Sequence, residues 1–186
     1  MTGARQGGFS LLELLVALLV IVLVTSLVSL NIGSGGQDIE LEARVRNLGE
    51  VAAYALDEAQ MTGRDFGLLL QRDVVSRETV YSYEWRERLP AGWRPPETGK
   101  DVFEPQVLPP GFELQLELED APVEELSLAE GEEDAAPQVV FYASGEVTAG
   151  AVEVRRESDG DLLWRIEWDL LGRFSVLPRG EELELE

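Results

Sequence analysis

The first strong feature of the sequence is an apolar run of 22 residues, from Phe9 to Leu30, in which the only ionisable side chain is Glu13. At about 1.5 Å of rise per residue, a helix of this length measures roughly 33 Å and can cross a hydrocarbon layer of about 30 Å. The pattern therefore predicts a transmembrane helix. The alternative is a cleaved secretory signal peptide, which requires more basic residues before a shorter apolar core and small residues before its cut site.

A second helical pattern follows a short stretch that contains Gly33, Gly35 and Gly36. Each glycine destabilises a helix by about 1 kcal/mol relative to alanine, so these three residues are predicted to form a hinge. From about Gln37 to Met61, apolar residues recur every three or four positions and form one stripe: Leu41, Val45, Leu48, Ala52, Ala55 and Ala59. We expect this stripe to pack against the C-terminal globular domain rather than to form an interface with a partner.

Beyond residue 63 the pattern changes from helical to alternating. Residues 112–119 and 163–169 alternate apolar and polar side chains without a break, which is typical of strands with one dry face. Shorter strands are predicted at residues 67–72, 79–85, 138–142, 147–156 and 173–177. No helical pattern separates the strands, so they are expected to pair antiparallel. The predicted fold class is α+β, with a long N-terminal transmembrane and amphipathic helix packed on an antiparallel β-sheet or two-layer β-sandwich.

Two segments of the domain do not read as sheet. Residues 89–110 hold six of the nine prolines, which cannot donate to a sheet ladder, and are predicted to form an irregular connection. Trp93 lies among these prolines and is expected to join the core, with exposure for a partner as the alternative. Residues 121–137 combine many acids with little apolar bulk and are predicted to form a mobile loop.

The composition excludes most kinds of active site. The chain has no Cys and no His, so thiolate nucleophiles, imidazole bases, disulfides and Cys/His zinc sites are absent. We expect no enzymatic activity, no cofactor and no metal. The acids around residues 130–134 are better explained as a solvated loop. Asp159-Gly160-Asp161 lacks the closing Glu of a calcium-binding loop and is better explained as a hairpin turn.

The charge balance bears on the partners. The chain has 36 Asp and Glu against 15 Lys and Arg, a formal net charge of -21, so nucleic acid and anionic lipid headgroups are repelled. Arg155 and Arg156 form the only adjacent basic pair after the apolar run. Glu13 needs a separate explanation, because an acid in a membrane helix costs about 2.5–3.5 kcal/mol on insertion scales. This chain has no Lys or Arg at that depth, so the compensating cation is expected to come from another polypeptide.

The N-terminal residues resemble the leader and first helix of type IV pilins and pseudopilins. The leader Arg5-Gln6-Gly7-Gly8 is followed by Phe9, and Glu13 stands at the fifth position after the cut. The resemblance implies that prepilin peptidase cleaves between Gly8 and Phe9 and methylates the new amine of Phe9. It also implies that Glu13 pairs with the N-terminal amine of a neighbouring subunit, and that Phe9 and Glu13 set the register of assembly. Unlike many type IV pilins, the chain has no proline in its first helix, since the first proline after Phe9 is Pro90.

The rest of the chain is similar to the minor pseudopilin H family of type II secretion. The similarity lies in the order of three segments, 108–112, 139–148 and 169–173, and in the helix around residues 46–64. It implies a structural subunit near the tip of a periplasmic pseudopilus that supports export of folded proteins across the outer membrane. The implied partners are the major pseudopilin, other minor pseudopilins, prepilin peptidase and the inner-membrane assembly platform, with no nucleic acid. The alternative is a minor type IV pilin that acts in pilus assembly or DNA uptake.

The resemblance also predicts how the chain is divided and placed. The expected parts are a leader (1–8), a transmembrane helix (9–32), a glycine hinge (33–36), an amphipathic helix (37–62) and a β-rich periplasmic domain (63–186). The chain is expected to cross the inner membrane once. Its N-terminus would then be cytoplasmic, in agreement with Arg5 and the excess of basic residues that cytoplasmic ends carry.

Overall fold

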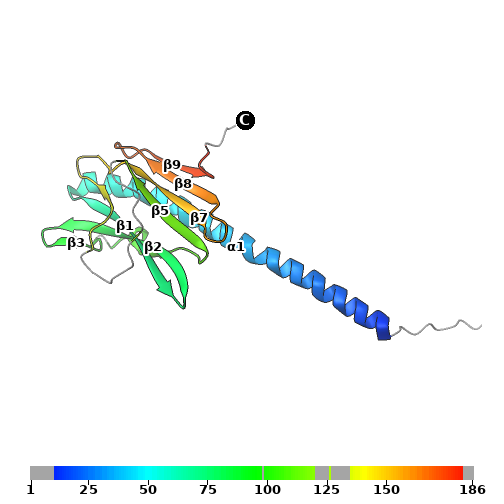
Figure 1. Cartoon of the computed structure of the whole chain (residues 1–186). Coiled ribbons are helices and arrows are strands. Elements are labelled where there is room, and N and C mark those ends of the chain that lie inside the picture. The colour runs from blue at the N-terminus through cyan, green and yellow to red at the C-terminus, as the bar shows by residue number, and fades with distance from the viewer. Residues whose placement is uncertain (1–10, 98, 120–125, 127–134, 182–186) are drawn as a thin grey trace, which may run out of the picture. The chain divides into compact units, whose positions relative to one another are not determined.

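The computed structural model describes residues 11–97, 99–119, 126 and 135–181, and within the helix it describes the side chains of residues 12–22 and of residues from 36 onward. These residues form a long helix and two antiparallel sheets, which confirms the predicted α+β class (Figure 1). The chain divides into two compact units, Met1–Glu40 and Leu41–Glu186. The C-terminal part of the helix therefore belongs to the same unit as the sheets.

The helix α1 extends from Leu11 to Thr62. It continues through Gly33, Gly35 and Gly36, so the predicted hinge, the predicted amphipathic segment and residues 11–32 of the predicted transmembrane segment belong to one helix, and the hinge remains a prediction. Gly63 ends the helix with a φ of 68°, and its N–H donates to the carbonyl oxygen of Ala59 at 2.9 Å. A left-handed residue at this position is what a glycine accepts at little cost.

The first sheet has the strand order β3-β2-β1-β6, with β4 also paired to β2. Its long hairpin consists of β1 (Phe66–Val75) and β2 (Glu78–Leu89), which pair from Phe66↔Glu87 to Val75↔Glu78. The short strands are β3 (Gly92–Arg94), β4 (Gln106–Val107) and β6 (Val139–Phe141). The strands predicted at 67–72, 79–85 and 138–142 are thereby confirmed.

The second sheet has the order β5-β7-β8-β9. Its strands are β5 (Phe112–Leu118), β7 (Gly150–Arg156), β8 (Leu162–Trp168) and β9 (Phe174–Pro178). The two strands with unbroken alternation are found within one residue of their predicted ends. β7 starts three residues later than predicted because Val147 pairs with Phe141 in an isolated bridge and donates its N–H to Leu170 O at 3.0 Å.

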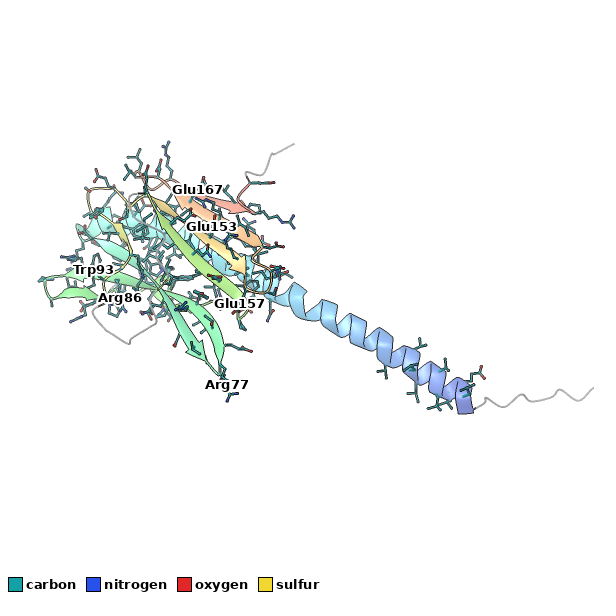
Figure 2. All side chains as sticks on the ribbon, viewed as in Figure 1. Arg77, Arg86, Trp93, Glu153, Glu157 and Glu167 are labelled. Carbon is teal, nitrogen blue, oxygen red and sulfur yellow. The ribbon has the colours of Figure 1, made fainter. Side chains whose placement is uncertain are left out.

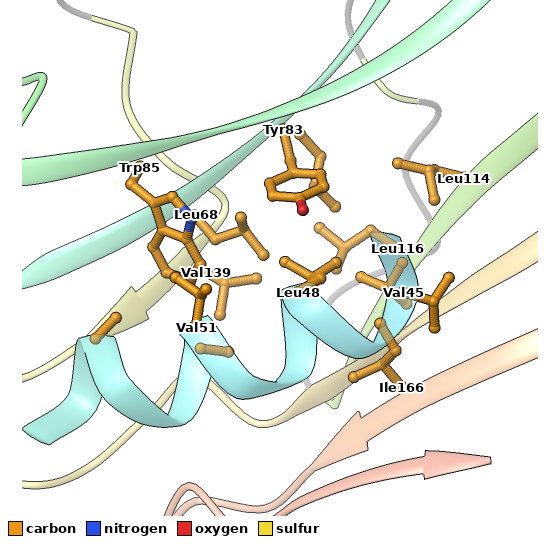
Figure 3. Close-up of a cluster of buried hydrophobic side chains, with 14 of the residues drawn as sticks. Val45, Leu48, Val51, Leu68, Tyr83, Trp85, Leu114, Leu116, Val139 and Ile166 are labelled. Carbon is orange, nitrogen blue, oxygen red and sulfur yellow. The ribbon is translucent and has the colours of Figure 1, made fainter. Parts of the chain in front are cut away.

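The predicted apolar stripe of α1 forms the centre of the core. All six of its residues, Leu41, Val45, Leu48, Ala52, Ala55 and Ala59, are at most 4% exposed. Figure 3 shows Val45, Leu48 and Val51 of α1 facing side chains from both sheets, among them Tyr83 and Trp85 of β2 and Leu114 and Leu116 of β5. The expectation that the stripe carries the globular domain is confirmed.

The proline-rich segment 89–110 is more ordered than predicted. It contains β3, a 3-10 turn η1 (Asp101–Phe103) and β4. Phe103 is buried, and its ring lies 5.3 Å from that of Phe66 and 5.8 Å from those of Tyr54 and Trp85, measured between centroids. Trp93 is only 9% exposed, so it joins the core and is not held out for a partner. The predicted acidic loop 121–137 lies outside the described residues except for 126 and 135–137.

Candidate assembly site

The N-terminal part of α1 is apolar on every side. Its large apolar side chains are 51–71% exposed: Leu12, Leu14, Leu15, Val16, Leu18, Leu19, Val20, Ile21 and Val22. At 100° per residue these positions are distributed around the helix, and the widest gap between them contains only Glu13 and Ala17. This contrasts with the one-sided stripe of the same helix beyond residue 41. A helix that is apolar all round is found in a buried environment.

The structure describes one of the two predicted assembly residues. Glu13 is in the first turn of α1 and is exposed, while Gly8 and Phe9 lie outside the described residues. A carboxylate near a helix N-terminus also gains from the positive end of the helix dipole. Of the predicted hinge residues, Gly36 is exposed, and a Cβ placed on it would meet no atom within 4 Å.

Across the part of the chain that the structure describes, no helix is both long enough and apolar enough to cross a lipid bilayer. The predicted transmembrane segment 9–32 lies partly outside the residues whose positions and side chains are described.

The outward face of the second sheet carries a network of ion pairs centred on Arg165 of β8. Its guanidinium contacts Glu153 at 2.6 Å, Glu117 at 3.0 Å and Glu167 at 3.3 Å. Burial opposes the charge of Arg165, but the hydrogen bonds to these carboxylates raise its pKa above the ordinary value. Figure 2 shows Glu153 and Glu167 on this sheet. The acid of the network that is most deeply buried, Glu153, is also paired with Arg155, at 2.6 Å.

The only adjacent basic pair after the apolar run, Arg155 and Arg156, forms ion pairs within the chain. Arg155 pairs with Glu153. Arg156 Nε lies 3.8 Å from Oδ2 of Asp159, in the turn between β7 and β8. The same turn contains Gly160, whose N–H donates to the carbonyl oxygen of Arg156 at 2.8 Å. The Asp159-Gly160-Asp161 sequence therefore forms the predicted hairpin turn. Among the described residues, no group of three or more acids is arranged to hold a metal ion.

A further ion pair joins the proline-rich segment to α1. The Lys100 Nζ donates to Glu58 Oε2 at 2.7 Å and to the Tyr54 hydroxyl at 2.5 Å. The hydrogen bond from Lys100 lowers the pKa of Glu58 below its ordinary value of 4.5, with smaller help from Tyr54. No local pattern predicted this contact, because the three residues meet only after the segment 89–110 folds back on the helix.

Comparison with known proteins identifies the family. Residues 3–29 match the model of the prokaryotic N-terminal methylation motif. Residues 44–172 match the model of type II transport protein GspH. The chain belongs to the GspH family. This places it in type II secretion and confirms the first hypothesis of the sequence analysis, a minor pseudopilin, over the type IV pilus alternative.

Individual relatives agree with the GspH assignment. The chain is 30% identical over 146 residues to type II secretion system protein H of Pseudomonas aeruginosa, which covers 76% of this chain and 78% of the relative. It is 26% identical over 186 residues to the protein of the same description from Aeromonas hydrophila, with 97% and 98% covered. Its fold is similar to the crystal structure of the minor pseudopilin EpsH from the type II secretion system of Vibrio cholerae. That match has a TM-score of 0.60 at 23% identity and covers 78% of this chain and 98% of the other.

Proposed function

We propose that this GspH-family chain is a non-enzymatic structural subunit of a periplasmic pseudopilus, located near its tip. The N-terminal part of α1 anchors it in the inner membrane with the N-terminus cytoplasmic, and the unit that contains the two sheets lies in the periplasm. The observation that carries the proposal is the change along α1 from large exposed apolar side chains around the helix, between Leu12 and Val22, to a one-sided stripe that is buried in the domain.

The free energy of solvation supports the anchor. Burying a Leu, Ile or Val side chain is worth about 1.5–3 kcal/mol. The exposed apolar residues between Leu12 and Val22 together therefore represent on the order of 10 kcal/mol. A lipid bilayer, or a bundle of similar helices in an assembled fibre, removes this surface from water.

The acid in this segment supports assembly with other subunits. At an effective dielectric constant of 20, a cation about 4 Å from Glu13 would contribute about 4 kcal/mol, which exceeds the insertion cost of about 2.5–3.5 kcal/mol. We propose that this cation is the methylated N-terminal amine of Phe9 in a neighbouring pseudopilin. The partners are the major pseudopilin, other minor pseudopilins and the inner-membrane assembly platform. The glycines Gly33, Gly35 and Gly36 allow the helix to bend during extraction.

The test of this function replaces the acid without changing the apolar surface. We expect Glu13→Leu to leave the chain in the membrane fraction but to lower its co-purification with the major pseudopilin at least about tenfold, since a lost charge pair of 1.4 kcal/mol already gives that factor. Glu50→Leu is the matched control, because Glu50 is an exposed acid of the same helix. Equal co-purification of the two variants would contradict the proposed role of Glu13.

Maturation is tested separately, at the predicted cleavage site. Prepilin peptidase has to bind an extended backbone at Gly8, where a residue without Cβ fits most easily. We expect Gly8→Val to accumulate the uncleaved chain, while Gly3→Val in the same leader is processed as the wild type. Mass spectrometry of the N-terminus gives the result. A normal yield of methylated Phe9 from Gly8→Val would contradict the assignment.

A further inference from the structure

The turn between β8 and β9, residues 169–173, has a firmly bonded backbone. Asp169 Oδ1 accepts hydrogen bonds from the backbone N–H of Leu171 and of Arg173, each at 3.0 Å. Asp169 Oδ2 accepts another from Nε of Arg173 at 2.7 Å, and the N–H of Gly172 donates to Asp169 O at 2.9 Å. The backbone N–H of Arg173, followed by its guanidinium, lowers the pKa of Asp169. The carboxylate that closes the turn is therefore charged at neutral pH.

The same turn is fixed to the body of the domain, yet it exposes two large apolar side chains. Leu170 O accepts the Val147 N–H at 3.0 Å, and a Cβ built on Gly172 would come within 2.2 Å of Leu56 Cδ2 on α1. Leu170 is nevertheless 58% exposed and Leu171 65% exposed. Because the backbone is held on both sides, the turn cannot fold these leucines inward. Adjacent apolar side chains kept in water by a fixed backbone are typical of an interaction surface.

A groove of about 860 Å³ lies beside this turn on the outward face of the second sheet. Its lining includes the small residues Ala149, Gly150 and Ala151 of the β7 region, which leave a depression between β5 and β8. Leu170 and Leu171 line the same groove. A second hollow of about 330 Å³ adjoins it, shares Leu170 with it and extends to Tyr142, which is 41% exposed. The two hollows together form one surface, which we call the Leu170 groove.

The rim of the Leu170 groove is acidic. Five carboxylates line the two hollows, from Glu117, Glu119, Glu146, Glu167 and Asp169, against two guanidinium groups, from Arg165 and Arg173. Both guanidinium groups are already paired, Arg165 with Glu117 and Glu167 and Arg173 with Asp169. The carboxylates of Glu119 and Glu146 form no ion pair with the rest of the described residues and are both exposed. The groove thus combines unpaired negative charge with the exposed side chains of Leu170 and Leu171.

We infer that the Leu170 groove docks another pseudopilin of the same assembly, through an apolar side chain of that subunit flanked by Lys or Arg. The apolar side chain fits against Leu170, Leu171 and Tyr142, and the basic side chains pair with Glu119 and Glu146. Charge complementarity selects this partner, because nucleic acid and anionic lipid are repelled by the same rim. The inference rests on the proposed function and adds to it the surface used and the chemistry of the subunit that it receives.

The test uses the full-length chain in cells that carry the complete secretion system. The photo-reactive amino acid p-benzoylphenylalanine replaces Leu171, or Val75 as the matched control. Val75 is 53% exposed, is the last residue of β1 and does not line the groove; Figure 2 labels Arg77 in the turn that follows it. We expect cross-linking from position 171 to a pseudopilin, identified by mass spectrometry, with Lys or Arg within a few residues of the cross-linked site. The yield should fall at least tenfold in the Glu119→Lys/Glu146→Lys background and should not fall in Glu104→Lys, an exposed acid outside the groove.

The outcomes separate this inference from the proposed function. Three results would each overturn the inference that the groove docks a pseudopilin. They are equal cross-linking from positions 171 and 75, a cross-linked peptide without basic residues, and a cross-linking yield unchanged by the charge reversal. If any of these occurs while the chain still co-purifies with the major pseudopilin in a Glu13-dependent way, the proposed function stands. If co-purification with the major pseudopilin does not depend on Glu13, the proposed function itself is contradicted.

Discussion

The substitution Gly172→Ala, which adds a single methyl group, is the sharpest test of the structure. This residue has a φ of 68°, and a Cβ added to it would lie 2.2 Å from Leu56 Cδ2 and 3.2 Å from Val147 Cγ2. Carbon atoms in ordinary contact are about 3.5–4.0 Å apart. In Gly172→Ala, either the Leu56 side chain or the turn therefore has to move by roughly 1 Å or more. Both are held in place by the packing of α1 against the second sheet.

The expected cost has two parts that can be separated. A left-handed conformation costs a residue with a Cβ about 1–2 kcal/mol, and overpacking a closed site costs about 1–3 kcal/mol. We expect Gly172→Ala to lower the free energy of unfolding by about 2–5 kcal/mol. Gly160→Ala is the matched control, because Gly160 has a φ of 76° and open space around its Cβ position, so it carries the first part alone.

Urea unfolding of the full-length chain in detergent, followed by tryptophan fluorescence, measures both variants. With a slope of about 2 kcal/mol per molar, the midpoint should fall by about 1–2.5 M for Gly172→Ala and by about 0.5–1 M for Gly160→Ala. Leu56→Ala should relieve the clash, so the double variant Gly172→Ala/Leu56→Ala should lose less than the sum of the single losses by about 1–3 kcal/mol. Equal midpoints for the two glycine variants, or strict additivity with Leu56→Ala, would refute the packing of this turn on α1.

Two further predictions concern contacts that bind distant segments together. Because the pKa of Glu58 is lowered in the folded state, its pairing with Lys100 stabilises the fold above the ordinary carboxyl pKa of 4.5 and is lost as the pH falls through the lowered value. We expect Lys100→Met to be less stable than the wild type at pH 7 and nearly equal to it in acid, measured by urea midpoints across pH; a constant difference at every pH would argue against the pair. The side-chain amide of Gln138 makes the two hydrogen bonds that a neighbouring strand would make to Leu70. It accepts the Leu70 N–H at 2.8 Å and donates to the Leu70 carbonyl oxygen at 2.9 Å. Gln138→Ala leaves the backbone N–H and carbonyl of the buried Leu70 without these partners, so we expect the free energy of unfolding to fall by about 1–3 kcal/mol and hydrogen exchange at Leu70 to become faster. The control Gln115→Ala, on the outward face of the second sheet, should lower it by less than about 0.5 kcal/mol.

The parts of the fold that sequence predicts are those whose signal is local. β5 and β8 alternate apolar and polar residues without interruption, and the structure finds them within one residue of the predicted ends. The stripe from Leu41 to Ala59 is local in the same sense, because six positions of one helix face have to be apolar together. A period of 2 or 3.6 residues reports directly which face of an element is buried.

The proline-rich segment shows where local signals fail. Prolines correctly indicate that residues 89–110 cannot form a long strand, but they contain no information about what the segment covers. Phe103 is buried because the rings of Tyr54, Phe66 and Trp85 come from α1, β1 and β2 to meet it. Trp93 is buried in the same way, with the guanidinium of Arg88 5.2 Å from its ring centroid. Burial of this kind depends on pairs that are distant in sequence, and composition alone leaves it open.

The two candidate interaction sites differ in the same respect. Glu13 can be recognised from the sequence because a single acid within an apolar run conflicts with its immediate neighbours. The Leu170 groove cannot, because Ala151 leaves space on the outward face only through its register opposite Glu117 on β5 and Glu167 on β8. One trace of it is nevertheless present: two adjacent leucines stand between Asp169 and Gly172, where a turn ordinarily carries polar residues. In such a turn the polar side chains already satisfy the backbone, so folding gives no reason to expose two adjacent apolar side chains. Association with another protein does give one, and the pattern is therefore a signal worth testing in other sequences.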